Sequence, residues 1–103
     1  MPKLKISNRA ERDLTEIGRY IAKDSPTNAF RFIQKLKKNL RILATQPMAG
    51  RARNELSPGL RSVFYGRYII FYYVSEQSVE IAHVLHSARD IERLLKAREA
   101  SGS

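Results

Sequence analysis

Two stretches with helical apolar spacing, separated by only a few residues, constrain the fold of this chain more than any other sequence feature. Ser7 or Asn8 can cap the first helix, and Ser25 followed by Pro26 is typical of the start of the second. Because only a turn separates them, we predict an antiparallel helical hairpin whose apolar faces cover another layer. Those faces comprise Ala10, Leu14, Ile17 and Ile21 in the first helix and Ala29, Ile33, Leu36, Leu40 and Leu43 in the second, with Phe30 and Phe32 widening the second face.

Three runs rich in Val, Ile, Phe and Tyr follow the hairpin and predict strands at Leu60–Tyr65, Tyr68–Val74 and Val79–Leu85. Gly66-Arg67 fits a two-residue type II′ turn, which pairs Tyr65 with Tyr68. A short strand is predicted at Leu4–Ile6 and a short terminal helix at Asp90–Arg98. The order β-α-α-β-β-β-α predicts an α+β fold, with the hairpin packed on a small, mostly antiparallel sheet. We expect one domain over residues 1–99 and a frayed tail at 100–103.

The two faces of the predicted sheet differ in polarity, since side chains alternate along each strand. We expect the helices to cover the more apolar face, which carries Leu60, Phe64, Ile69, Phe71 and Tyr73. The other face is half-polar and is predicted to line a groove; it carries Arg61, Val63, Tyr65, Tyr68, Ile70 and Tyr72.

The net charge of +9 indicates an acidic partner, because such an excess attracts polyanions. Between Ser25 and Ser75 Glu55 is the only acid among nine basic residues. The lysines of the second helix are predicted to be a solvated face. The arginines near the sheet are the candidate binding residues, because a guanidinium fork binds phosphate and carboxylate in bidentate fashion; they are Arg51, Arg53, Arg61, Arg67 and Arg89.

Few residues of this sequence suggest catalysis, and none suggests a cofactor. The chain has no cysteine and two histidines, His83 and His86, whose spacing on a strand directs them to opposite faces and excludes a paired metal site. No glycine-rich phosphate loop is present, so we expect neither a metal nor another cofactor. Glu55 is either a general base or a loop residue that pairs with Arg51 or Arg53. With no apolar run long enough for a signal peptide or a membrane span, we expect a cytoplasmic protein without membrane contact.

Several stretches together resemble the ParE branch of the RelE/ParE toxin superfamily. The first is Arg9-Ala10-Glu11-Arg12-Asp13-Leu14, continued by Ile17 and Tyr20-Ile21-Ala22. The others are Pro47-Met48-Ala49-Gly50-Arg51, Leu60-Arg61-Ser62, Gly66-Arg67-Tyr68-Ile69-Ile70-Phe71-Tyr72 and Val84-Leu85-His86-Ser87-Ala88-Arg89-Asp90. This resemblance covers nearly the whole chain and implies the RelE/ParE fold, a helical hairpin on a small, mostly antiparallel sheet.

The resemblance also implies the toxin of a bacterial type II toxin–antitoxin module. The expected partner is a cognate antitoxin of the ParD type, with a ribbon-helix-helix domain and an acidic C-terminal segment, bound in a hetero-oligomer. The expected target is DNA gyrase, with nucleic acid a secondary or indirect partner. The expected target-binding residues are Arg51, Arg53, Arg61, Arg67, His86 and Arg89, and the expected antitoxin-binding residues are Tyr65, Tyr68, Tyr72 and Arg61.

Two alternatives to a gyrase inhibitor stay open at this point. A RelE-type member would cleave mRNA on the ribosome, with Arg61 stabilising the phosphorane and His86 or Glu55 acting as acid or base. RelE itself carries a C-terminal tyrosine, and no tyrosine follows Ala88 here, so the resemblance favours ParE. The other alternative is a basic module that only binds nucleic acid or an acidic protein.

Overall fold

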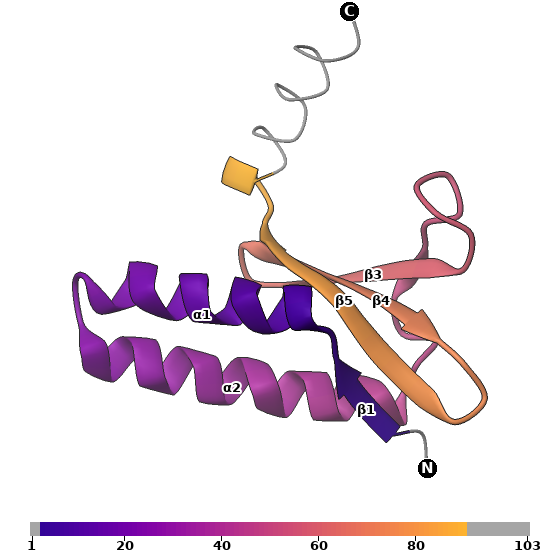
Figure 1. Cartoon of the computed structure of the whole chain (residues 1–103), viewed down its shortest axis with the longest axis horizontal. Helices are drawn as coiled ribbons and strands as arrows, with labels where there is room; N and C mark the ends of the chain where they lie inside the picture. Colours follow the sequence, from indigo (N-terminus) through magenta and orange to yellow (C-terminus); the bar gives the residue numbers. More distant parts are fainter. Residues whose placement is uncertain (1–2, 91–103) are drawn as a thin grey trace, which may run out of the picture.

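A helical hairpin and a mixed five-stranded sheet make up the computed structural model, which describes residues 3–90 (Figure 1). The helices are α1 (Asn8–Ala22) and α2 (Pro26–Thr45). The strands are β1 (Lys3–Ile6), β2 (Arg51–Ala52), β3 (Leu60–Tyr65), β4 (Tyr68–Val74) and β5 (Ser78–His86). The predicted α+β fold is confirmed. The predicted terminal helix at Asp90–Arg98 and tail at 100–103 lie outside the described residues, apart from Asp90.

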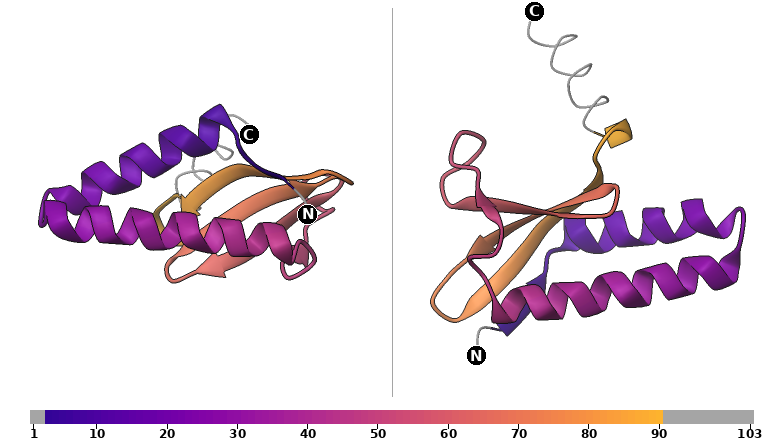
Figure 2. Two further views of the ribbon diagram at one scale, coloured as in Figure 1. Left: turned by 90° about the horizontal axis from the view of Figure 1, so that it is seen from below. Right: turned by 180° about the vertical axis from the view of Figure 1, so that it is seen from behind.

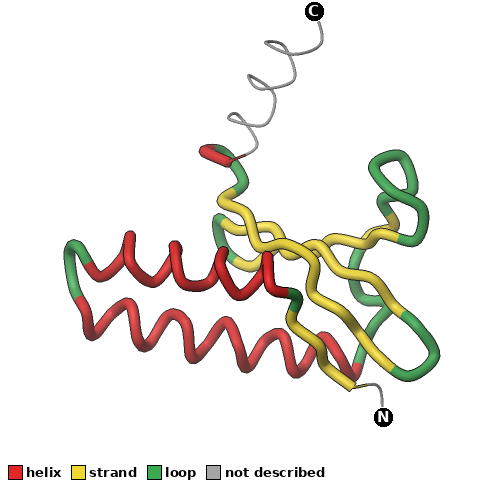
Figure 3. The backbone as a smooth tube through the Cα atoms, in the orientation of Figure 1, coloured by secondary structure: helices red, strands yellow, loops and turns green. Residues whose placement is uncertain are grey.

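Short polar signals set the helix ends. The Ser7 hydroxyl accepts a hydrogen bond from the Ala10 amide at the start of α1, and Ser25 does the same for Asn28 at the start of α2. Each serine satisfies an amide that has no partner within its helix. The tip of the hairpin projects well away from the sheet, and the loop between β2 and β3 lies on the opposite side of the molecule (Figures 2 and 3).

The sheet order is β1-β5-β4-β3-β2, with β1 parallel to β5 and the other neighbours antiparallel. The predicted turn is confirmed: Tyr65 pairs with Tyr68, and Gly66 has a φ of 58°, as the first central position of a type II′ turn requires. β2 was not predicted, since two residues are too few to show strand periodicity.

The prediction of which sheet face the helices cover is wrong. Tyr68, Ile70, Tyr72, Ile81 and Val84 belong to the core cluster that includes the buried residues of α1 and α2. Leu60 and Ile69 on the other face are also buried but lie outside this cluster, and Phe64 there is 62% exposed. The half-polar face is therefore the covered one, and the Tyr72 hydroxyl and the Arg61 guanidinium on it are hydrogen-bonded within the fold.

The apolar face of α2 is also narrower than predicted. Leu36, Leu40 and Leu43 are buried as expected, and Phe32 packs partly against the core. Phe30 instead is 68% exposed, because it lies on the outer side of the helix.

Candidate functional site

The loop that follows α2 is held against the sheet by two side chains predicted to contact partners, Tyr72 and Arg61. The Tyr72 hydroxyl is buried, donates to the Pro47 carbonyl at 2.8 Å and accepts from the Gly50 amide at 2.9 Å. Arg61 Nη2 donates to the carbonyls of Met48 and Gly50. We call this arrangement the loop clasp; it gives Tyr72 and Arg61 a structural role within the fold.

Gly50 completes the loop clasp because nothing larger fits there. A Cβ at this position would lie 2.7 Å from the Ser62 carbonyl oxygen and 2.8 Å from Tyr72 Cε1, and closer still to the Tyr72 hydroxyl oxygen. One neighbour is backbone and the other is a fully buried ring, so neither can move away cheaply. The Pro47-Met48-Ala49-Gly50 stretch is thus a structural element of the fold.

Beyond the loop clasp, β2 and the loop after it present Arg51 and Arg53 at one end of the sheet. Arg51 is exposed, whereas Arg53 Nε donates to the Ser62 hydroxyl at 2.8 Å. Glu55 lies 3.9 Å from Arg53 Nη1 and is 58% exposed, which confirms the expected pairing within the loop. This ion pair is long and solvated, so it contributes little to stability.

The remaining predicted cationic residues gather at the opposite end of β3 and β4. Arg67 is exposed in the β3–β4 turn, and its carbonyl accepts from the Ser87 amide at 2.7 Å. His86 Nδ1 accepts from the Arg89 amide at 3.0 Å, and its ring stacks edge-on against Tyr68. The structure thus divides the predicted target-binding residues into two separate groups.

The three residues expected to act in RNA cleavage do not share a site. Arg61 pairs with Tyr72 of β4, and His86 pairs with Tyr68 of the same strand. Tyr68 and Tyr72 are four residues apart, so the two positions are separated along the strand by about 13 Å, at about 3.3 Å per residue. Glu55 lies in the loop after β2, on the Arg61 side. No catalytic geometry joins these three side chains.

The tyrosines expected to bind the antitoxin lie mostly inside the core. Tyr68 is 7% exposed and Tyr72 is fully buried, so the two offer almost no surface to a partner. Tyr65 is half-buried and stacks on Phe32, and this residue alone of the three keeps a partly open ring. Burial also raises the pKa of Tyr68, since it disfavours the phenolate; the nearby Arg89 acts in the opposite direction.

A buried carboxylate on α1 closes the part of the β5 edge that β1 leaves uncovered. The β1–β5 pairing ends at Ile81, and beyond it Asp13 Oδ2 accepts from the Val84 amide at 2.9 Å. The same oxygen lies 2.9 Å from His83 Nδ1, and Arg9 Nε lies 3.3 Å from Oδ1. Asp13 is only 4% exposed, so this cluster satisfies a charge that would be costly to bury alone.

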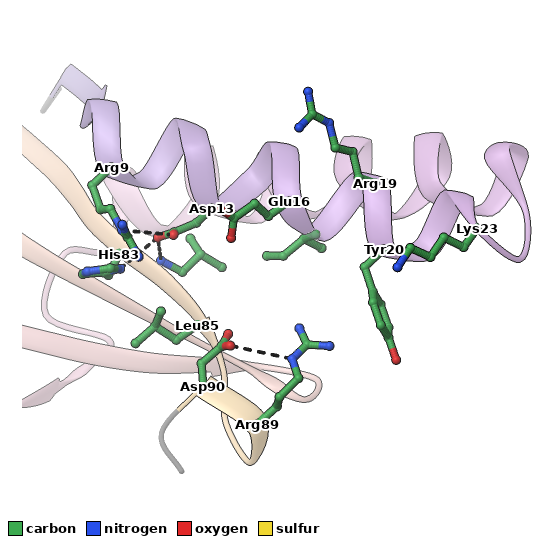
Figure 4. A pocket seen from close by; sticks show the side chains of 12 residues that line it. Arg9, Asp13, Glu16, Arg19, Tyr20, Lys23, His83, Leu85, Arg89 and Asp90 are labelled. Carbon is green, nitrogen blue, oxygen red and sulfur yellow. Dashed lines mark hydrogen bonds and ion pairs between the residues drawn. The ribbon is translucent and has the colours of Figure 1, made fainter. Parts of the chain in front are cut away.

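An open groove of about 830 Å³ runs between α1 and the end of β5; we call it the α1–β5 groove (Figure 4). Arg9, Asp13 and His83 meet at one end, and Tyr20, Arg89 and Asp90 lie toward the other. The Arg89 guanidinium sits 4.6 Å from the centre of the Tyr20 ring, and its Nε is 3.6 Å from Asp90. Between these ends the groove is lined by the apolar side chains of Ile17, Val84 and Leu85. Glu16, Arg19 and Lys23 add charged groups to its lining.

Asp13 and Tyr20 line the α1–β5 groove but were not among the predicted site residues. The signal for Asp13 was present: it lies three residues after Ala10 and four before Ile17, so it shares their buried helix face. An acid within an apolar stripe indicates a partner in the core.

No metal site or membrane span is found among the described residues. Within 3–90, no three histidine or acidic side chains gather in a way that could hold a metal ion. The register places His83 opposite Phe71 and His86 opposite Tyr68, which confirms that they face opposite sides of the sheet. No helix in this range is long and apolar enough to cross a bilayer.

Comparison with known proteins places this geometry in context. Residues 4–91 match the family described as the ParE toxin of the type II toxin–antitoxin system, parDE. Toxin RelE2 of Caulobacter vibrioides is 38% identical over 81 residues, which cover 79% of this chain and 90% of that protein. Toxin ParE1 of Mycobacterium tuberculosis is 32% identical over 68 residues, 65% of this chain and 69% of that protein.

A solved structure gives the same fold. It is described as the chromosomal ParDE TA system from P. aeruginosa and superposes with a TM-score of 0.71 at 22% identity. The match covers 84% of this chain and 96% of that chain. At this identity the likeness concerns the fold alone.

Proposed function

The chain belongs to the ParE toxin family of type II toxin–antitoxin systems, and on that premise we propose that it stops bacterial growth by poisoning DNA gyrase until a cognate antitoxin binds it. The observation that carries the choice of a non-enzymatic inhibitor is the position of Arg61. Its guanidinium donates to two loop carbonyls, and its backbone position lies about 13 Å along the strand direction from that of His86. An endoribonuclease would need these groups on one phosphate.

Of the arginines predicted to bind the target, Arg51 and Arg67 are exposed and Arg89 is half-buried, and these three are the proposed target contacts. Arg53, Arg61 and His86 each make polar contacts within the fold, so we assign them to positioning these segments. Exposed guanidinium groups suit an acidic protein surface as well as phosphate. Cleaved DNA held by gyrase would then be an indirect partner.

The proposed antitoxin is ParD-like and binds through an acidic C-terminal segment. The net charge of +9 steers such a segment to the toxin, and apolar burial then retains it. The α1–β5 groove offers both features, since Arg19 and Lys23 flank the apolar residues Ile17 and Leu85.

Expression in a bacterial host tests the target. We expect growth arrest with relaxed or linearised plasmid DNA, intact mRNA, and full rescue by the antitoxin encoded in the neighbouring reading frame. Arg51→Ala combined with Arg67→Ala should restore growth. Lys35→Ala combined with Lys38→Ala removes the same charge from the exposed face of α2 and should leave the arrest unchanged.

Two outcomes contradict the proposal. Ribosome-dependent cuts in mRNA with normal plasmid topology point to a RelE-type endoribonuclease. Unimpaired growth at full expression without antitoxin points to a basic binding module.

A further inference from the structure

The outer edge of β3 is covered for only part of its length. β2 pairs with Arg61 and Ser62, and the Arg53 amide donates to the Leu60 carbonyl. The backbone N–H and C=O groups alternate in direction along a strand. Those of Leu60 and Ser62 point toward β2, and the next residue whose backbone groups point to that side is Phe64. Within residues 3–90 no strand pairs with Phe64 on that side, because the chain before Arg51 turns away toward α2.

Exposed apolar side chains lie beside this uncovered edge. Phe64 is 62% exposed and Ile42 on α2 is 48% exposed. Both residues line a hollow of about 150 Å³, together with Leu43, Val63, Tyr65 and Ile70 among others. An edge strand with exposed apolar side chains and no charge of its own over Val63-Phe64-Tyr65 is a template for another strand.

Charge selects the occupant of this edge. A second copy of the chain brings another +9, and the two copies repel each other. Three exposed arginines surround this edge. Arg41 precedes Ile42 on α2, Arg51 of β2 pairs with Ser62 of β3, and Arg67 lies in the turn after β3. An extended segment that combines apolar and acidic residues can hydrogen-bond the β3 backbone, fill the hollow with an apolar side chain and pair its carboxylates with the arginines.

We propose that the edge of β3 from Val63 to Tyr65 binds an extended acidic segment of the antitoxin as an added strand, with an apolar side chain in the hollow between Phe64 and Ile42. This inference rests on the proposed function only for the identity of the partner. The edge of β3 would be a second antitoxin contact besides the α1–β5 groove, and β4 lies between β3 and β5 in the sheet.

Amide hydrogen exchange and affinity together test the proposal, using the full chain and the antitoxin from the neighbouring reading frame. On complex formation we expect exchange of the Phe64 amide to slow by about tenfold or more, because its outward N–H gains a partner. Phe64→Lys should weaken antitoxin binding by about tenfold or more. Leu56→Lys, a change at a residue that is 60% exposed in the β2–β3 loop, should alter it by less than about twofold.

Three results overturn the proposal and can be told apart. A complex of wild-type affinity with Phe64→Lys and unchanged exchange at Phe64 rejects the β3 edge but leaves the toxin–antitoxin function intact. Protection of Phe64 that rises with concentration of the chain alone assigns the edge to a second copy. Failure of the wild-type chain to bind the antitoxin at all rejects the proposed function itself.

Discussion

Replacing Gly50 with alanine should destabilise the chain more than the same change at Gly18, Gly59 or Gly66. The new Cβ would lie 2.7 Å from the Ser62 carbonyl oxygen and 2.8 Å from Tyr72 Cε1. Overpacking of this kind costs about 1–3 kcal/mol. Relief of the overlap also displaces the hydrogen bond between the Gly50 amide and the Tyr72 hydroxyl, which contributes about 1 kcal/mol. We therefore expect a loss of about 2–4 kcal/mol in the free energy of unfolding.

Urea unfolding followed by circular dichroism measures this loss. Gly18→Ala is the matched control: its Cβ would lie 3.6 Å from Ile33 Cγ1, an ordinary contact, and alanine within α1 should stabilise the chain by up to about 1 kcal/mol. Tyr72→Phe should cost about 1–3 kcal/mol alone, and less when Gly50→Ala has already broken the loop clasp. Equal urea midpoints for Gly50→Ala and the wild type would mean that the loop moves freely and that the loop clasp does not stabilise the fold.

Three further changes test other contacts of the fold. Arg61→Ala should lower the free energy of unfolding by about 1–3 kcal/mol, since two loop carbonyls lose their donor; urea unfolding measures it. Asp13→Ala should cost about 2–4 kcal/mol, because the buried Val84 amide loses its acceptor and Arg9 its partner, whereas Asp13→Asn keeps an acceptor and should cost less. The pKa of Tyr68 is raised in the folded state, so Tyr68 contributes stability below about pH 10 that is lost as the pH rises above it. The free energy of unfolding of Tyr68→Phe should therefore fall less than that of the wild type between about pH 9 and pH 11.5.

The helices and the three longer strands could be predicted because local signals determine them. Ser25 followed by Pro26 marks the start of α2, and Gly66 at positive φ sets the register of β3 on β4. These signals need no tertiary context, so periodicity and turn chemistry are sufficient. The two-residue β2 carries no such signal, and it forms where the chain after the loop clasp pairs with Arg61 and Ser62 of β3.

The covered face of the sheet could not be predicted, because its burial depends on partners distant in sequence. Tyr72 lies 25 residues from Pro47, whose carbonyl accepts a hydrogen bond from the Tyr72 hydroxyl, and with that bond the ring can be fully buried. Arg61 likewise meets the carbonyls of the same loop. Pattern alone makes these residues look like an open binding surface. The carboxylate of Asp13 likewise has a role only because β1 stops short along β5.

The candidate site was predicted in part. Arg51 and Arg67 are exposed as expected, and Arg89 lines the α1–β5 groove. Their separation into two groups is a consequence of strand register, which places Arg61 and His86 opposite different residues of β4. The sequence alone shows no reason to divide the predicted target-binding residues, and only the strand register places them at two ends of the sheet.

A supercoiling assay with purified DNA gyrase and the purified chain tests directly whether the chain poisons gyrase. We expect supercoiling to stop near a one-to-one ratio of chain to gyrase and linear DNA to accumulate after protein removal. Pre-incubation with the antitoxin should abolish both effects. Normal supercoiling and no cleaved DNA at a stoichiometric excess of folded chain would show that gyrase is not the target.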